Sequence, residues 1–492
     1  MRSFAPRHLA AALALFFGSV ASWAQTASSP AAGGATQYVI TLSQGVAVLQ
    51  PQNPYSGSVP EGKATGDVIP LSLKDAIARG LKQNLGLLLT NEGITSARGQ
   101  YWKDRSGLLP NLSTSTSFSD EQINLSTVGF NVKAFGPLGI HINPIAGPFG
   151  VFDTRAFVTQ SIFDWRTIQQ TRSSAQQLKA ARYSYKDARE LVVFAVASAY
   201  LQTIADAARV DTAIAQRDTA QALAQQAADQ FKAGTTAAID ALRAKVQLQT
   251  NEQQVISTRN DLAKQKIALA RVIGLPTDQE FTLSDNPAYE PSARISLEEA
   301  LRRAYATRSD YQSALAQVRA ATLARKAAVA QHYPSISTAV NYGDIGVNPG
   351  NSHGTLDATA SLNIPIFLGG KIHGDVLQAD AALRQSQELL SNLRAQIEQD
   401  VRDSLLDLQS AADLVEVARS NVDLANQTLQ QSRDRFAAGV TDNVEVVQAQ
   451  QSVTSANESL ISSLYSYNVS KVELARATGR ADAGVQEYLK GR

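Results

Sequence analysis

The apolar residues of this chain change their spacing from a helical period to a strand period and back, and the change occurs twice. Apolar and polar residues alternate in four segments, 112–118, 154–163, 336–342 and 356–364. Alternation of this length is typical of a strand with one apolar and one polar face. The pattern therefore predicts one hairpin in each half of the chain, and four strands in all.

After each predicted hairpin comes a long segment with a helical pattern. Residues 166–232 and 371–437 contain no proline and almost no glycine. At about 1.5 Å per residue, each would form a helix of roughly 100 Å. In the second segment apolar residues follow in steps of three, four or seven, which is typical of a coiled coil. They are Ile397, Val401, Leu405, Leu408, Ala412, Val415, Val422 and Leu429.

Each long segment ends at a glycine, Gly234 or Gly439, and a second helical segment returns to about Gly274 or Gly479. Glycine just past a helix end suits the left-handed backbone conformation that closes many helices. We therefore expect two helical hairpins with Gly234 and Gly439 at their tips.

The two halves are copies of one another. DQFKAGTTAAIDAL (229–242) matches DRFAAGVTDNVEVV (434–447), 205 positions later. Nearer the start the spacing is 224, because LSLKDAI (71–77) matches ISLEEAL (295–301). The first copy therefore holds about 20 more residues. They fall in an insert at 119–153 that is rich in Gly and Pro and predicts an enlarged loop.

A helix is predicted to open each copy, at 72–107 and at 296–331. Ser72 and Ser296 stand at N-cap positions, each with an acidic residue three positions later. Each helix ends just before a proline, which restricts the preceding residue to extended conformations.

The first residues have the features of a secretory signal peptide. Arg2 and Arg7 supply a basic start, residues 9–17 form a short apolar run, and Ala24 suits a cleavage position. The apolar run is too short to span a bilayer. We expect 1–24 to be removed and the protein to be exported.

Composition excludes several classes of function. There are 45 basic and 44 acidic residues, without the basic excess that is usual in nucleic-acid binders. The chain has no cysteine, which excludes disulfides, cysteine metal sites and thiol nucleophiles. We find no nucleophile elbow, phosphate loop or HExxH motif, and the five histidines do not cluster at ligand spacing. We therefore expect no catalytic residue, cofactor or metal site.

These patterns predict an α+β membrane protein built from a duplicated repeat. The expected parts are a signal peptide (1–24), an irregular N-terminal extension (25–70), a first repeat (71–274), a linker (275–294), a second repeat (295–479) and a C-terminal tail (480–492).

Four strands with one lipid-compatible face cannot stand alone. Open sheet edges are not tolerated in hydrocarbon, and about eight strands is the lower limit for a membrane barrel. Several copies must therefore contribute to one barrel. Three copies would give twelve strands and would arrange their long helices as a second, α-helical tube.

The sequence resembles the outer-membrane efflux proteins, the TolC family of exit ducts, from about Leu71 to Gly479. The resemblance rests on the duplicated order of elements, on PIFLGGK (365–371), and on RFAAGVTDNVEVVQAQ (435–450) with its partner QFKAGTTAAIDALRAK (230–245). Many members of the family carry a lipidated cysteine after the signal peptide, and this chain has none.

The resemblance implies a homotrimer that joins a twelve-stranded barrel in the Gram-negative outer membrane to an α-helical barrel in the periplasm. Such ducts passively export small molecules or proteins. They are coupled to a periplasmic adaptor (membrane fusion) protein and an energised inner-membrane transporter.

In this family, acidic residues near the hairpin tips form carboxylate rings that narrow the periplasmic opening. Asp240 and Glu445 lie six residues after Gly234 and Gly439, and Asp442 is a further acid. A carboxylate ring attracts cations and resists crowding by like charge. The alternative is an ordinary solvated acid in the first turn of a helix, where the helix dipole favours it.

The resemblance also places the hairpin tips against the adaptor. The candidate docking residues are Gly234, Gly439, Phe231 and Phe436. For each phenylalanine the alternative is packing inside its own hairpin.

Eight residues of the predicted strands are candidates for the lipid-facing surface or an interfacial aromatic girdle. They are Leu112, Phe118, Phe157, Ile336, Val340, Tyr342, Leu356 and Leu362. The competing interpretation is packing at the junction of barrel and helices, which applies most to Phe163 and Phe367.

Two other functions are compatible with an exported chain. One is a coiled-coil structural or adhesion protein without a channel, but a fibre needs no lipid-facing hairpins. The other is a porin-like barrel, which would need about 16 strands in one chain.

Overall fold

The computed structural model describes residues 40–43, 46–49, 54–128, 143–285, 295–441 and 443–481. The chain divides into two compact units, Met1–Gln52 and Asn53–Arg492. In the first unit the described residues form an antiparallel hairpin of β1 (Ile40–Ser43) and β2 (Val46–Leu49). The extension 25–70, expected to be irregular, thus contains a short hairpin.

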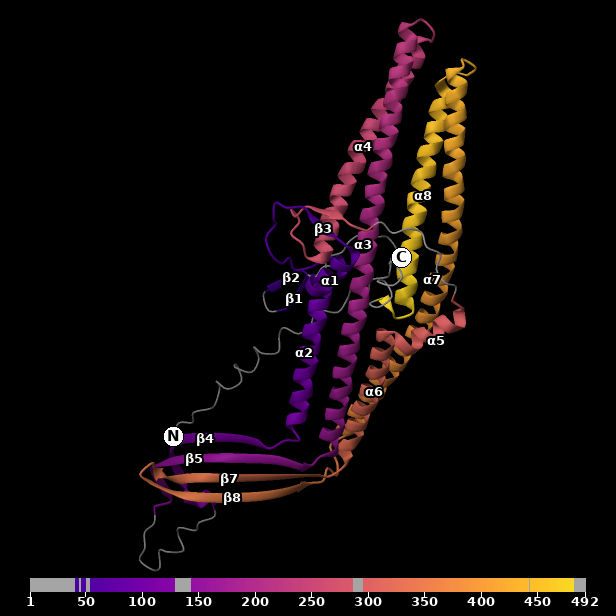
Figure 1. The fold of residues 1–492 in the computed structure, drawn as a ribbon. Helices are drawn as coiled ribbons and strands as arrows, with labels where there is room; N and C mark the ends of the chain where they lie inside the picture. Colours follow the sequence, from indigo (N-terminus) through magenta and orange to yellow (C-terminus); the bar gives the residue numbers. More distant parts are fainter. Residues whose placement is uncertain are drawn as a thin grey trace, which may run out of the picture. The chain divides into compact units, whose positions relative to one another are not determined.

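The second unit repeats one order of elements, as Figure 1 shows. Its helices are α1 (Leu73–Gln83), α2 (Leu85–Ser106), α3 (Trp165–Lys232), α4 (Ala238–Ile273), α5 (Leu297–Thr307), α6 (Ser309–Val329), α7 (Lys371–Ala437) and α8 (Asn443–Ala477). Its strands are β3 (Ile69–Leu71), β4 (Asn111–Asn124), β5 (Ile145–Phe163), β6 (Phe281–Leu283), β7 (Ser335–Asn348) and β8 (Asn351–Asn363). Short 3₁₀ turns are η1 (Pro54–Ser56), η2 (Leu125–Val128) and η4 (Ala330–His332). The predicted duplication, with two helical hairpins and four long strands, is confirmed.

The four long strands form one antiparallel sheet in the order β4-β5-β7-β8. β5 of the first repeat pairs with β7 of the second, so the two hairpins become a continuous sheet. β4 and β8 are left as its two edges. A separate parallel pair, β3 with β6, lies beside α1.

The expected loop at 119–153 is partly strand. β4 continues to Asn124 and β5 begins at Ile145, so the ladder extends into both ends of the insert, while residues 129–142 lie outside the described residues. A β-bulge between Glu121 and Ile123 accommodates Gly147, whose φ is +111°. Bulges commonly admit glycine without ending a strand pair, so Gly147 and Pro148 lie within the strand pair and not in a loop.

Each opening helix, expected to be continuous, is broken into two. Asn84 (ψ 128°) separates α1 from α2, and Arg308 (ψ 123°) separates α5 from α6. Both residues have extended backbone and are buried. The predicted N-caps are confirmed, because Ser72 and Ser296 accept from the N–H groups of Asp75 and Glu299.

The long helices pack side by side in one layer, and different helices form its two edges. Toward the hairpin tips the order is α4-α3-α8-α7, and toward the sheet it is α2-α3-α6-α7. α3 lies inside the layer in both halves and supplies Val192, Val196 and Tyr200 to the largest apolar cluster. Among the described helices, α3 alone is long and apolar enough to cross a membrane. We interpret it as a core helix because it packs against helices on both sides.

Candidate functional site

The two helical hairpins end in matching turns. Gly234 (φ +76°) follows α3, and Gly439 (φ +72°) follows α7. The N–H of Thr235 donates to the carbonyl of Gln230, and that of Val440 donates to the carbonyl of Arg435. These are the bonds of a helix end closed by a left-handed residue, where glycine carries no steric cost.

Each predicted gate acid lies in the first turn of the returning helix. Its carboxylate accepts a hydrogen bond from a threonine of the loop that joins the two helices. The hydroxyl of Thr236 donates to the carboxylate of Asp240 at 3.5 Å, and Thr441 donates in the same way to Glu445. The carboxylates are therefore at equivalent places in the two repeats. Asp442, the third candidate, lies outside the described residues.

The two acids differ in their cationic partners. Asp240 pairs with Arg243 of its own helix at 3.5 Å, and its side chain is 15% exposed. Glu445 pairs across the turn with Arg435 of α7 at 3.2 Å, and its side chain is 34% exposed. Ser432 of α7 also donates to Glu445 at 3.4 Å. The second tip is thus tied across its own hairpin, while the first is not tied by this acid.

One hydrogen bond joins the two tips directly. Asn443, the first residue of α8, is buried, and its amide donates to the main-chain carbonyl of Asp240 at 3.2 Å. No sequence pattern marked Asn443, because its partner is a backbone atom about 200 positions away. This contact lets the position of one hairpin depend on the other.

The two tip phenylalanines have different surroundings. Phe436 packs against the cluster of Leu429, Val446 and Ala449 between α7 and α8. Phe231 is 48% exposed and belongs to none of the apolar clusters of the described residues. Packing inside the hairpin therefore describes Phe436, while Phe231 is left on the surface.

Below the tips, a polar groove of about 470 Å³ separates the two hairpins. Its walls come from α3, α4, α7 and α8 and are mostly amides and hydroxyls, with Arg433 and Asp211 as charged members. Between the hairpins at this level, Leu223 of α3 packs against the cluster of Leu429, Val446 and Ala449.

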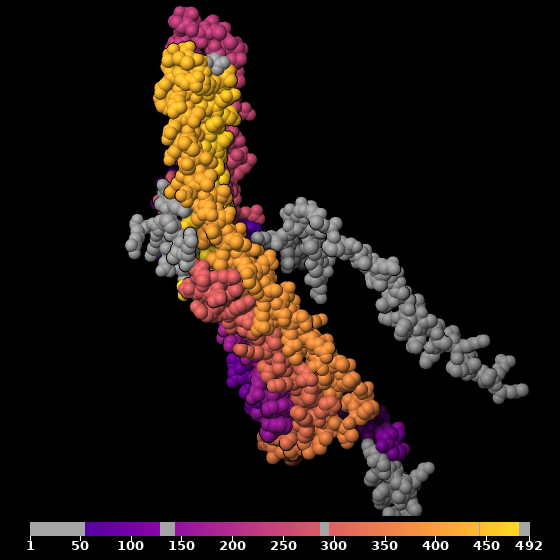
Figure 2. All heavy atoms as spheres, turned by 90° about the vertical axis from the view of Figure 1, so that its right-hand side faces the viewer, coloured from indigo at the N-terminus to yellow at the C-terminus, as the bar shows by residue number. Residues whose placement is uncertain are grey.

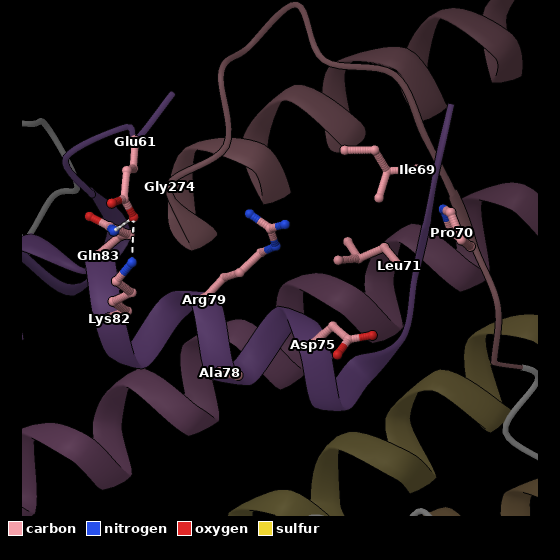
Figure 3. Close-up of a pocket in the computed structure, with 10 residues that line it drawn as sticks. All are labelled: Glu61, Ile69, Pro70, Leu71, Asp75, Ala78, Arg79, Lys82, Gln83 and Gly274. Atoms are coloured by element: carbon pink, nitrogen blue, oxygen red, sulfur yellow. Dashed lines mark hydrogen bonds and ion pairs between the residues drawn. The ribbon is translucent and has the colours of Figure 1, made fainter. Parts of the chain in front are cut away.

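A second cavity, of about 440 Å³, lies beside α1 (Figure 3). The guanidinium of Arg79 points into it, and Glu61 joins Lys82 at 2.7 Å at one end. This cavity is shallow and mixed in charge. Within the described ranges, no three His, Asp or Glu side chains gather where they could hold a metal ion.

The sheet has one apolar and one polar face, which the register defines. Leu112, Val158, Val340 and Ala358 form one cross-strand row on the apolar face. Seven of the eight candidate residues share this face. They are Leu112, Phe118, Ile336, Val340, Tyr342, Leu356 and Leu362, all exposed in the single chain.

Phe157 is the exception, and its assignment to that set was wrong. Its cross-strand partners are Ser113 and Asn341, so it lies on the polar face. The guanidinium of Arg155 lies 5.4 Å from its ring. Phe163 and Phe367 are both exposed in the single chain and do not pack inside it.

Buried charges mark the junction of α5 and α6, which sequence reasoning missed. Arg308 pairs with Asp310 at 2.7 Å and with Asp400 of α7 at 2.9 Å. On α3 nearby, Glu190 accepts from Ser309, and burial and repulsion from Asp187 raise the pKa of Glu190 to about 7. Charged residues on long helices usually face water, so their pattern carried no signal.

Known proteins match this arrangement. A family model described as outer membrane efflux protein matches residues 78–275 and 300–480. The chain belongs to this family. The resemblance stated from the sequence is therefore confirmed, and the protein is located in the outer membrane.

Relatives of the chain have low sequence identity to it but match it over most of its length. The outer membrane protein TolC of Escherichia coli K12 is 23% identical over 340 residues, which cover 65% of this chain and 68% of TolC. The probable efflux pump outer membrane protein TtgC of Pseudomonas putida is 23% identical over 425 residues, covering 83% of each chain.

Solved structures have the same fold. The CmeC outer membrane channel of Campylobacter jejuni superposes with a TM-score of 0.72 at 16% identity, covering 92% of this chain and 98% of CmeC. VceC of Vibrio cholerae has a TM-score of 0.70 at 18% identity, covering 83% and 96%.

Proposed function

We propose that three copies of this chain form an exit duct that spans the outer membrane and extends into the periplasm. Cargo, whether small molecules or proteins, moves passively through it. A periplasmic adaptor and an energised inner-membrane transporter supply coupling and energy. One observation supports this proposal most. The sheet and the helix layer of the chain each end in two different exposed edges, and one edge of a copy can pair with the other edge of the next copy.

The sheet edges support closure into a ring. β4 and β8 each have one unpaired side, and an unpaired strand in hydrocarbon leaves backbone N–H and C=O groups without partners. β4 of one copy can pair with β8 of the next, and this head-to-tail contact repeats until the ring closes. Three copies of a four-stranded sheet give twelve strands.

The helix edges carry matching apolar stripes. On α4, Ile239, Leu242, Val246, Ile256 and Ile267 are at least half exposed and recur at helical spacing. On α7, at the other edge, the residues more than half exposed are Leu377, Leu389, Leu406, Leu414, Val417 and Leu424. Figure 2 shows the face on which α7 (orange) and α8 (yellow) lie uncovered along the layer. Exposed apolar residues that recur along one side of a helix are typical of a helix that packs against a partner.

A coiled-coil adhesion protein without a channel would leave the apolar face of the sheet without a role. Membership of an efflux family also favours the duct. Since the chain shows no catalytic motif and its relatives are channel proteins, we infer that it acts without catalysis.

Within the duct, we assign the gate to Asp240, Glu445 and Asp442 and the adaptor surface to the tips. Equivalent acids from three copies would form rings of negative charge at the periplasmic end. Phe231 is an exposed apolar residue of the first tip that is available to an adaptor, as is Val440 at the second tip. Gly234 and Gly439 set the shape of the turns. Phe436 acts indirectly by holding the second tip together.

The test of the duct is the mass and shape of the detergent-extracted protein, by light scattering and negative-stain imaging. We expect a trimer with a tapered tube longer than about 100 Å. A monomer or dimer that stays in solution without detergent would refute the duct.

The test of the gate is conductance in planar bilayers. Replacing both acids, Asp240→Ala with Glu445→Ala, is expected to raise single-channel conductance several-fold and to weaken the preference for cations. Asp218→Ala, an exposed acid of α3 away from the tip, is the matched control. If the double variant has the same conductance and ion preference as the parent protein, the assignment of these acids to the gate is wrong.

A further inference from the structure

The polar face of the sheet holds an ion pair that the proposed gate does not use. Arg155 and Asp153 lie two positions apart on β5, so they share this face. Nε of Arg155 donates to Oδ1 of Asp153 at 2.8 Å, and a second guanidinium nitrogen donates to Oδ2 at 2.5 Å. A bidentate pair of this kind fixes the plane of the guanidinium.

Neighbouring strands hold the same guanidinium. Its third nitrogen donates to the side-chain oxygen of Asn341 on β7 at 3.3 Å, and the ring of Phe157 lies beside it. The cross-strand partner of Arg155 on β7 is Gly343, where an added Cβ would collide with the backbone of β5. Since this position has no side chain, β7 leaves Arg155 uncovered on that side.

A second carboxylate lies one strand further. Asp357 on β8 is the cross-strand partner of Asn341, and it attracts the guanidinium of Arg155. On β4 the partner of Arg155 is Ser115, which is neutral. The cluster therefore has two carboxylates and one guanidinium, and a net charge of −1 in each copy.

The level of this cluster in the sheet is defined by the opposite face. Ala156, next to Arg155, pairs with Tyr342, and Thr154 pairs with Asp344. Beyond these pairs, on the side away from the helices, Phe118 pairs with Phe152 on the same face, so the cluster lies within the height of the apolar surface. The cluster is in the sheet, at the other end of the long helices from the acids of the hairpin tips.

We propose that Asp153, Arg155 and Asp357 form a charged ring inside the barrel that favours cationic solutes at the outer end of the duct. The inference rests on the proposed function, because it needs three copies closed with the polar face inward. Three copies would place six carboxylates around three guanidinium groups. Charge lining a narrow water-filled pore selects between ions of opposite sign.

The experiment uses the absence of cysteine from the native chain. Ser115→Cys places a single thiol opposite Arg155, and purified trimers in detergent are treated with a cationic or an anionic thiosulfonate. The rate ratio of cationic to anionic reagent reports the local potential and does not depend on the periplasmic gate. We expect the ratio to exceed one when Arg155 and both carboxylates are native.

Two substitutions that each remove one charge should move the ratio in opposite directions. Adding Arg155→Gln is expected to raise it about fivefold, since one positive charge per copy is lost at close range. Adding Asp357→Asn is expected to lower it by a similar factor, and Arg155→Lys should leave it near the parent value. Each variant is first shown to be a trimer by its mass.

The outcomes separate this inference from the proposed function. A thiol at Ser115 that reacts, with a ratio unchanged by Arg155→Gln and by Asp357→Asn, overturns the charged ring while leaving the duct intact. The control is Thr114→Cys, on the apolar face. If that thiol reacts with both reagents while the thiol at Ser115 does not, the polar face is not inward, and the duct itself is contradicted.

Discussion

The two repeats bend their opening helices at matching places with different chemistry. In the first repeat the bend is at Asn84, whose amide donates to the carbonyl of Tyr55 at 2.6 Å and accepts from the N–H of Gly86 at 3.0 Å. In the second it is at Arg308, held by two carboxylates. The same backbone break is thus stabilised by a neutral amide in one copy and by buried charge in the other.

The hairpin tips differ in a related way. The first tip leaves Phe231 on the surface, while the second packs Phe436 and ties Glu445 back to α7. The two repeats therefore have the same backbone conformation at equivalent places, while different side-chain contacts stabilise it. At these two places the second repeat depends more on side-chain contacts, so it should respond more strongly to substitution.

The largest difference is expected at the two bends. Arg308→Met leaves Asp310 and Asp400 without their partner and should cost about 3 kcal/mol, whereas Asn84→Ala should cost about 2 kcal/mol. Chemical unfolding of both variants at pH 7 measures the two costs. Equal losses of unfolding free energy would contradict the contrast.

The second prediction concerns Glu190, whose pKa is raised from 4.5 to about 7, first by burial and then by Asp187 and Asp310. A raised pKa means that the native state holds a proton that the unfolded chain releases. The contribution of Glu190 to the free energy of unfolding is therefore fully present below pH 4.5, and it is lost as the pH rises toward 7. We expect a loss of about 2 kcal/mol, less than the full shift implies because the side chain keeps contact with water.

Glu190→Gln should remove this part of the pH dependence, measured as unfolding midpoints from pH 5 to pH 8. Glu398→Gln, an exposed acid paired on the surface of α7, is the control. If the variant at Glu190 keeps the full slope of the parent, the raised pKa of this group does not govern stability.

The third prediction compares the tip phenylalanines. Phe436→Ala removes a half-buried ring and should cost about 1.5 kcal/mol, seen as faster hydrogen exchange in the last turn of α7. Phe231→Ala should change exchange in α3 little, because its ring is exposed. Under the proposed function, Phe231→Ala should instead weaken adaptor binding. Equal effects on exchange at both tips would show that the tips are packed alike.

The smallest effect is expected for the bond between the hairpins. Asn443→Ala removes one hydrogen bond to the carbonyl of Asp240 and should cost about 1 kcal/mol, or about a fivefold rise in hydrogen exchange at the start of α4. Ser452→Ala, whose hydroxyl bonds within α8, is the control. An unchanged exchange rate in α4 would mean that the two hairpins are not coupled at this point.

Which face a strand residue occupies was not always readable from the sequence. Phe157 and Val158 are adjacent and both apolar, so alternation required one of them to leave the apolar face. Pairing with β4 and β7 decided in favour of Val158. Arg155 stood in the same alternating segment, but its partner Asn341 lies 186 positions away. A contact at that separation leaves no local signal.

The sequence by itself determined the elements and their repetition. Helix and strand periods arise from backbone geometry within a few residues, and glycine at a positive φ is a local requirement, so the long helices end where their patterns end. Only the tertiary structure decided where the opening helices bend, how far β4 and β5 extend, and which charges are buried at Arg308 and Glu190. Those features depend on burial and on pairing between segments that are distant in the sequence. Such contacts exist only in the folded chain, so no local pattern predicts them.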